Sequence, residues 1–106
     1  LAALPIGQYC PEWHQRPRHI SPQESVQIMK DLKGHKMVGV HWGTFVLSSE
    51  NFLDPARELT LLAHKENRPN SIIVPQCGRT IVMDTDKMDF EHDDKAVQEG
   101  AVTVYQ

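Results

Sequence analysis

The sequence predicts one α/β unit made of two helices and three to four short strands. Two amphipathic patterns, each opened by a helix-start signal, alternate with short runs rich in β-branched residues. With 106 residues, of which 40% are hydrophobic, the chain has the size and composition of a single domain with a core. The formal net charge of -3 argues against the basic surface of a nucleic-acid-binding protein.

The N-terminal third is predicted to contain a short strand, an ordered loop and a helix. The segment from Pro5 to Pro17 is rich in proline, glycine and aromatic residues without a helical period, which indicates a loop. Ser21-Pro22-Gln23-Glu24 matches a capping box with proline at the first helical position, so a helix begins there. Gly34 is placed where a left-handed C-terminal cap ends that helix. The stripe that this helix buries is predicted to consist of Val26, Met29, Leu32 and, in part, Lys33.

The centre of the chain predicts a buried strand and a second helix. Lys36 to Val40 is a short, mostly apolar run, and His41 follows at its C-terminal end. Asp54-Pro55 repeats the pattern of a capping residue followed by proline, and the helix that it opens is predicted to end near Asn67. The face of this second helix is traced by Ala56, Leu59, Leu62, Ala63 and Glu66.

Two β-rich runs complete the predicted domain, which occupies residues 1–83. Ser71 to Val74 and Thr80 to Met83 flank a five-residue connection, a pattern that predicts a two-stranded ribbon. Residues 84–106 open with an acidic segment that is typical of a solvated, disordered tail. An edge strand from Ala101 to Tyr105 is an alternative to a frayed end. The acidic residues do not have the spacing of an EF-hand, which argues against that calcium site.

Composition also limits membrane attachment and disulfide bonding. No run approaches the roughly 18 apolar residues of a spanning helix, so any membrane association would be peripheral. Cys10 and Cys77 are far apart and form no CxxC pair, which favours reduced thiols in the cytoplasm. The chain opens with Leu1 and lacks a signal-peptide pattern, so truncation or processing is the simplest explanation of its start.

His41 is the first candidate functional residue. It is predicted to follow a buried strand and to precede Trp42 and Gly43, at the position where α/β proteins place ligand- and metal-binding groups. One histidine does not make a metal site, and a core histidine satisfied by a backbone carbonyl fits the same spacing. The residue pattern alone leaves both interpretations open.

Five short motifs follow one another along residues 3–83. They are Pro5-Ile6-Gly7, Tyr9-Cys10-Pro11, the segment from His19 to Glu24, the run from His41 to Phe45, and Asp54-Pro55. Together they resemble the C-terminal part of the family of N-acylphosphatidylethanolamine-hydrolysing phospholipase D, and the His41 to Phe45 run (HWGTF) is the most specific element. The resemblance implies the C-terminal part of a metallo-β-lactamase αββα sandwich.

The same resemblance implies a zinc-dependent phosphodiesterase that releases an N-acylethanolamine and phosphatidic acid. In that family two zinc ions are held by a His-x-His-x-Asp-His segment, a further His, a bridging Asp and a final His, which the resemblance places at His41. The other ligands would precede this chain. We therefore expect the chain alone to retain no zinc and to be inactive.

Other residues acquire weaker assignments from the resemblance. His19 is similar to a histidine near the substrate phosphate, where a protonated imidazole would offset negative charge, although an exposed loop histidine fits as well. Arg16 and Arg18 either bind phosphate or form a solvated pair, and neither is assigned to the site. Two positions depart from the family, and three aromatic residues are interpreted as packing residues rather than walls of a lipid pocket. The departures are Gln8 and His14, and the aromatic residues are Tyr9, Trp13 and Trp42.

Two other interpretations remain open from the sequence. The chain is either part of a related metallo-β-lactamase-fold hydrolase with another substrate or a small, non-catalytic α/β binding module. The family implies a phospholipid substrate, a membrane surface and a peripheral membrane location, which adds to the cytoplasmic setting that the cysteines favour. An exposed strand edge in so short a chain predicts marginal stability or homo-oligomers.

Overall fold

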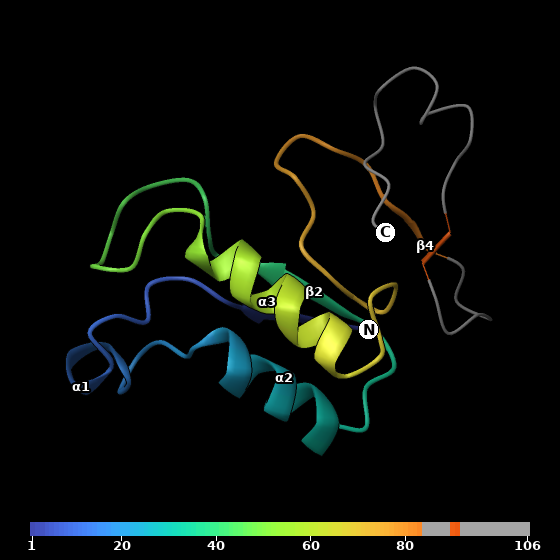
Figure 1. Cartoon of the computed structure of the whole chain (residues 1–106), viewed down its shortest axis with the longest axis horizontal. Helices are drawn as coiled ribbons and strands as arrows, with labels where there is room; N and C mark the ends of the chain where they lie inside the picture. Colours follow the sequence, from blue (N-terminus) through green and yellow to red (C-terminus); the bar gives the residue numbers. More distant parts are fainter. Residues whose placement is uncertain (84–89, 92–106) are drawn as a thin grey trace.

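A computed structural model describes residues 1–83 and 90–91 (Figure 1). The helices are α1 (Glu12–Gln15), α2 (Pro22–Asp31) and α3 (Asp54–Lys65). The strands are β1 (Ala2–Pro5), β2 (Met37–Val40), β3 (Ile72–Ile73), β4 (Val82–Met83) and β5 (Phe90–Glu91). The small α/β unit is thus confirmed, with a one-turn helix, α1, inside the segment that was predicted to be a loop.

Three parallel strands form the main sheet in the order β1-β2-β3. Ala3 pairs with Val38, which in turn pairs with Ile73. The order of the strands in the sheet is the same as their order along the chain. Two right-handed crossovers that advance in the same direction place both connecting helices on the same face of the sheet. Figure 1 shows α2 and α3 side by side, with β2 behind α3. The carboxyl end of the central strand lies beside the loop that leads to α3.

Helix α2 begins at the predicted capping box. The Ser21 hydroxyl accepts a hydrogen bond from the Glu24 N–H at 3.3 Å, and the Glu24 carboxylate accepts one from the Ser21 N–H at 3.2 Å. These two bonds satisfy backbone donors that the first turn of a helix otherwise leaves without partners. Local sequence therefore fixes the start of this helix.

The end of α2 differs from the prediction. Lys33, not Gly34, has the left-handed conformation, with φ of 55°. The Gly34 N–H donates to the Met29 carbonyl at 2.8 Å, and the Lys33 N–H donates to the Lys30 carbonyl at 2.9 Å, as in a Schellman motif. Gly34 instead permits close approach, because a Cβ there would lie 3.1 Å from the Met29 side chain. Leu32 is 67% exposed, so its predicted place in the buried stripe is wrong.

Helix α3 starts one residue earlier than its capping pattern predicts. Asp54 is its first helical residue, and Leu53 is an N-cap without a side-chain hydrogen bond. The Asp54 carboxylate instead accepts from the Asn51 N–H at 3.2 Å and so stabilises the preceding loop. The helix ends at Lys65, close to the predicted end.

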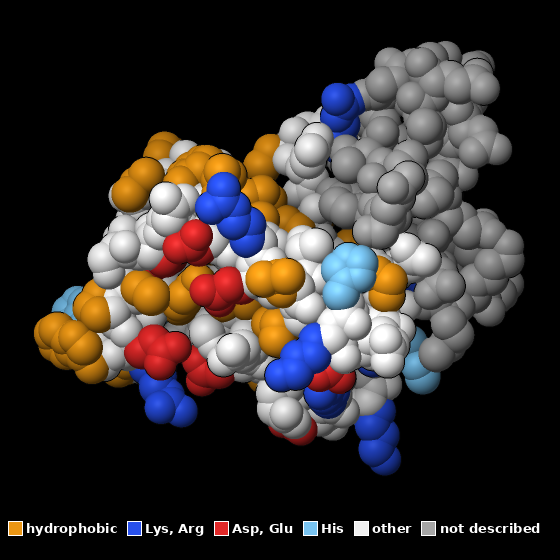
Figure 2. Space-filling view, viewed as in Figure 1, with side chains coloured by type: hydrophobic (Ala, Val, Ile, Leu, Met, Phe, Trp, Pro, Cys, Tyr) orange, Lys and Arg blue, Asp and Glu red, His pale blue; other side chains and the backbone are white. Residues whose placement is uncertain are grey.

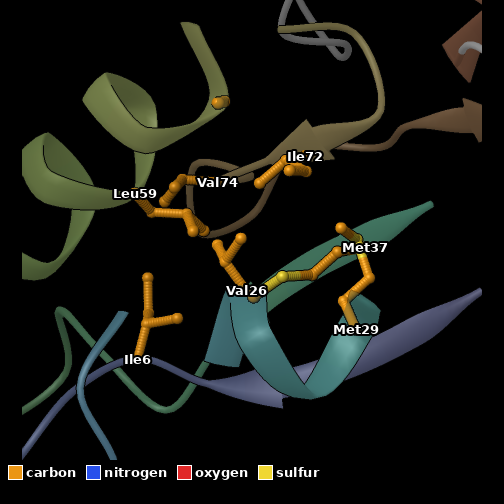
Figure 3. Close-up of a cluster of buried hydrophobic side chains, with 8 residues drawn as sticks. Ile6, Val26, Met29, Met37, Leu59, Ile72 and Val74 are labelled. Carbon is orange, nitrogen blue, oxygen red and sulfur yellow. The ribbon is translucent and has the colours of Figure 1, made fainter. Parts of the chain in front are cut away.

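The core lies between the two long helices and the sheet (Figure 3). Leu59 of α3 is fully buried against the sheet, where Gly39 leaves space for it. A Cβ on Gly39 would lie 2.7 Å from the Leu59 side chain and 2.8 Å from that of Ile6. The buried hydrophobic cluster consists of Ile6, Val26, Met29, Met37, Leu59, Ala63, Ile72 and Val74.

The predicted ribbon between Ser71–Val74 and Thr80–Met83 is wrong. Strand β3 pairs with β2 in parallel, whereas β4 pairs antiparallel with β5. Pairing with the central strand leaves Ile72 and Ile73 only 2% exposed each, a burial that a two-stranded ribbon does not provide.

The C-terminal predictions are only partly described. Phe90–Glu91 belongs to the segment that was predicted to be a tail, and it forms strand β5. The rest of residues 84–106, including the edge strand predicted from Ala101 to Tyr105, lies outside the described residues. Within residues 1–83 and 90–91, no helix has the length and apolarity needed to cross a bilayer.

Candidate functional site

His41 directly follows the central strand, as the sequence predicts. Its side chain is exposed, so the alternative of a buried core histidine is wrong. The backbone of His41 adopts φ of 60°, which is uncommon for a residue other than glycine. Gly7 lies against it, because a Cβ on Gly7 would clash with the His41 carbonyl oxygen. The absence of a side chain at Gly7 thus allows the two segments to approach.

His19 and His41 lie together. Their ring centroids are 5.4 Å apart and the ring planes make an angle of 24°, so the two imidazoles are stacked. His19 comes from the loop between α1 and α2, and it is half-buried. The fold therefore brings the two predicted site residues from separate segments into one pair, in which each ring carries nitrogen atoms that donate, accept or bind a metal.

A cavity of about 190 Å³ lies beside His41. Its walls come from Gly7 and Gln8 on one side and from the segment 41–55 on the other. Three consecutive side chains of this loop are strongly exposed: Phe45 at 72%, Val46 at 75% and Leu47 at 57%. Figure 2 shows hydrophobic side chains gathered at this end of the molecule, over the loop between β2 and α3. Clustered exposed apolar side chains are typical of a binding surface.

Glu50 links the two walls of the cavity. Its carboxylate accepts hydrogen bonds from the N–H groups of Gln8, Tyr9 (3.3 Å) and Cys10 (3.1 Å), and from the Ser48 hydroxyl. Burial acts to raise the pKa of Glu50, but the bonds from Ser48 and from the backbone outweigh it and lower the pKa. Sequence reasoning missed this residue, although a single carboxylate in a largely apolar loop is a detectable signal.

The three aromatic residues interpreted as packing residues have different environments. Tyr9 is 6% exposed, which confirms that it is a packing residue. Trp42 packs against the core as predicted, but it also lines the cavity, so the prediction that it is not a pocket wall is wrong. Trp13 is 83% exposed, so it does not pack in the core. Burial, followed by the nearby Glu58 carboxylate, raises the pKa of Tyr9. Burial and then the Glu50 charge raise the pKa of the Cys10 thiol, and both cysteines are free.

The remaining residues singled out from the sequence divide between cavity and surface. Gln8 lines the cavity, whereas His14 is exposed and meets the edge of Trp13 at a centroid distance of 5.4 Å. Arg16 is exposed and forms an ion pair with Glu24 at 3.7 Å, and Arg18 is exposed as well. Neither arginine lines the cavity.

The described residues do not make a complete metal site. In the described part of the chain, no three His, Cys, Asp or Glu side chains are grouped as metal ligands. Protein zinc sites use three or four such ligands. His41, with His19 beside it, supplies at most part of a ligand set.

The chain is an α/β protein with a cavity beside the carboxyl end of its central parallel strand, the edge at which α/β proteins commonly bind ligands. The chain is 55% identical over 84 residues to the mitochondrial N-acyl-phosphatidylethanolamine-hydrolysing phospholipase D of Saccharomyces cerevisiae, a match that covers 79% of this chain. It is 35% identical over 81 residues to N-acyl-phosphatidylethanolamine-hydrolysing phospholipase D 1 of Caenorhabditis elegans, covering 74% of this chain. The chain belongs to the family of N-acyl-phosphatidylethanolamine-hydrolysing phospholipase D, of which it represents a partial region.

The chain corresponds to only a small part of its relatives. The matches span 18% of the yeast protein and 23% of the nematode protein. An uncharacterised protein of Mycobacterium tuberculosis is 32% identical over 84 residues, which are 76% of this chain and 22% of that protein. No protein-family model matches the chain.

Proposed function

We propose that this chain is the part of a phospholipase D-type phosphodiesterase that carries His19 and His41. The substrate is N-acylphosphatidylethanolamine, and the products are an N-acylethanolamine and phosphatidic acid. The stacking of His19 on His41 beside an apolar-walled cavity is the observation that carries this proposal. Kinship with the yeast and nematode proteins, whose names state this activity, supports the substrate class.

The two histidines have different proposed roles. His19, as an imidazolium, binds the substrate phosphate and offsets the negative charge that develops during hydrolysis. His41 is one zinc ligand, and the others come from outside the described residues. Zinc, when bound by a full ligand set, supplies Lewis acidity at the phosphodiester. Because the described residues form only part of such a set, we expect the 106-residue chain alone to hold no stoichiometric zinc and to be inactive.

The metallo-β-lactamase fold is part of the same proposal. Met37 and Ile72 point to the core beneath α2 and α3, and Val38 belongs to the opposite face of the sheet by strand alternation. On that face Ala3 is exposed and Val40 is 39% exposed. Ile73, which pairs with Val38 on this face, is 2% exposed, so the exposed part of the face lies toward β1 and the end of β2. A second sheet packed there would complete an αββα sandwich.

The exposed loop from Phe45 to Leu47 supports a peripheral membrane location. Apolar side chains at the mouth of a cavity suit the acyl chains of a phospholipid held at a membrane surface. The yeast relative is named as mitochondrial, which makes an organelle membrane the first place to look. The cytoplasmic location and the homo-oligomers inferred from the sequence remain predictions.

A non-catalytic binding module is the second candidate. It is favoured by the incomplete metal-ligand set within the described residues, together with a buried cluster that joins both long helices to the sheet. A cavity of about 190 Å³ is small for a whole phospholipid and would accept a shorter ligand.

A chimera distinguishes the two candidates. We would replace the matching 84 residues of the yeast relative with those of this chain and measure hydrolysis of N-acylphosphatidylethanolamine and bound zinc. The chimera should hydrolyse the lipid. His41→Ala should lower both zinc content and activity, and His19→Ala should lower kcat by about 10²- to 10⁴-fold without loss of zinc.

His64→Ala is the matched control, because His64 is exposed near the end of α3 and does not line the cavity. It should leave zinc content and activity unchanged. A folded chimera that binds zinc and hydrolyses the lipid equally well without His41 would refute the enzymatic proposal and favour the binding module.

A further inference from the structure

Glu50 makes more hydrogen bonds than any other side chain described beside the cavity. Three consecutive backbone N–H groups, those of Gln8, Tyr9 and Cys10, converge on its carboxylate. Ser48 adds a fourth donor from the same loop as Glu50. Three successive N–H groups that point to one spot form a concave anion site, and here the chain fills that site with its own carboxylate.

These bonds join two segments that carry the site. Gln8 and Glu50 are separated by 42 positions in sequence, and both line the cavity. A second tie lies beside them, because the Ser49 N–H donates to the Cys10 carbonyl at 3.2 Å. At the other end of the same contact, Gly7 lies against the His41 carbonyl. The loop that follows His41 is therefore hydrogen-bonded to the loop that follows β1 near Glu50, and it packs closely against Gly7 at its start.

We propose that Glu50 is the positioning residue of this site: its carboxylate holds the loop after His41 against the Gln8–Cys10 backbone and so sets the stacking of His41 on His19. Glu50 does not touch the imidazoles in this arrangement; it acts through the backbone of the loop. The proposal concerns the geometry of the cavity and holds whether or not the chain takes part in phosphodiester hydrolysis.

The chemistry of the contact explains why a carboxylate is required. An ionised carboxylate has two acceptor oxygens with room for about four hydrogen bonds, which matches the three N–H groups and one hydroxyl present. Glutamine has the same shape but one acceptor oxygen and an NH₂ group that would face an N–H donor. The substitution Glu50→Gln thus breaks part of the contact without changing the volume of the side chain.

The effect of Glu50 on the Gln8, Tyr9 and Cys10 amides can be distinguished from the effects of the neighbouring titratable groups. Tyr9 and Cys10 have pKa values raised by burial and carboxylates, so neither loses a proton in the acid range. Glu58, Asp54 and Glu12 are the other carboxylates that influence these two side chains. Their titration would reach the Gln8, Tyr9 and Cys10 amides only through space, whereas that of Glu50 acts through direct hydrogen bonds.

The experiment is solution NMR on the ¹⁵N-labelled 106-residue chain. The amide signals of Gln8, Tyr9 and Cys10 should shift together as pH falls, with one midpoint below the ordinary glutamate value of about 4.3. Glu50→Gln should remove this titration. It should also remove the cross-relaxation between the His19 and His41 rings, while methyl contacts between Leu59 and Ile72 in the core persist.

Glu66→Gln is the matched control, since Glu66 forms an ion pair with Lys30 at 2.7 Å and does not line the cavity. It should leave both the amide titration and the ring contact intact. Persistence of the His19–His41 ring contact in Glu50→Gln would overturn the proposal. If Glu50→Gln does not fold, the titration of the unmodified chain decides, because three amides that do not shift together would equally overturn it.

Discussion

Individual residues show where sequence reasoning succeeds and where it stops. His41 was predictable because an apolar run followed by a histidine and a glycine marks the end of a strand. Its stacking partner, His19, was suggested only by family resemblance, since nothing in local spacing relates two histidines in separate loops. Glu50 stands out locally as a carboxylate in a largely apolar loop, but its role was missed because the backbone groups that it binds lie about 40 positions away, and no local pattern specifies them.

Gly7 offers a test of the contact between the two site loops. Gly7→Ala would push a methyl group into the His41 carbonyl oxygen, a rigid backbone atom, so the loops must separate. We expect a loss of about 1–3 kcal/mol in the free energy of unfolding, measured with urea. Gly34→Ala is the comparison and should cost less, because its Cβ would lie 3.1 Å from the Met29 side chain and 3.3 Å from the Met29 carbonyl oxygen, a much milder approach than the clash at Gly7. An equal loss in both variants would show that no special contact exists at Gly7.

The lowered pKa of Glu50 determines in which direction pH changes the stability of the folded chain. Its pKa is lowered in the folded chain, so its contribution to stability is fully present above the unfolded-state pKa of about 4.3 and is lost as pH falls through the folded-state value. Urea unfolding of the wild-type chain and Glu50→Gln should therefore differ most near neutral pH. The difference should shrink steadily below about pH 4. A difference that grows as the solution becomes more acidic would contradict this account of Glu50.

Elements were predicted well where their signals are local. The capping box at Ser21 fixed the start of α2, and the apolar period of α3 identified Leu59 and Ala63 as buried. Strand pairing was predicted poorly. Strand β3 pairs with β2 and β4 pairs with β5, and the sequence between β3 and β4 specifies neither pairing. The choice is made by burial, since Ile72 gains a place in the core only beside β2.

Helix α3 provides a matched pair of substitutions. Leu59 is fully buried in the core, whereas Leu61, two positions along the same helix, is 69% exposed. Leu59→Ala should cost about 2–5 kcal/mol in the free energy of unfolding, because it removes apolar contacts and leaves a cavity. Leu61→Ala should change it by less than about 0.5 kcal/mol. Similar losses in the two variants would mean that α3 does not pack through the predicted face.

The whole molecule has a buried hydrophobic core and also exposes apolar side chains on its surface. Helices α2 and α3 cover one face of the sheet, while Ala3 and Val40 on the other face remain exposed. The loop from Phe45 to Leu47 adds apolar surface at the cavity. Chain composition predicted a single small domain, but it could not predict that the two histidines would meet, because His19 precedes α2 and His41 follows β2, and their contact depends on how the chain folds between them.

The central claim is that His19 and His41 form one functional site. A double-mutant cycle in the yeast chimera tests it most directly, with kcat/KM for N-acylphosphatidylethanolamine hydrolysis measured for His19→Ala, His41→Ala and both together. Residues that act as a unit have non-additive effects, so the double variant should be no slower than the slower single variant. If the two losses multiply, the histidines act independently, and their stacking has no part in the reaction.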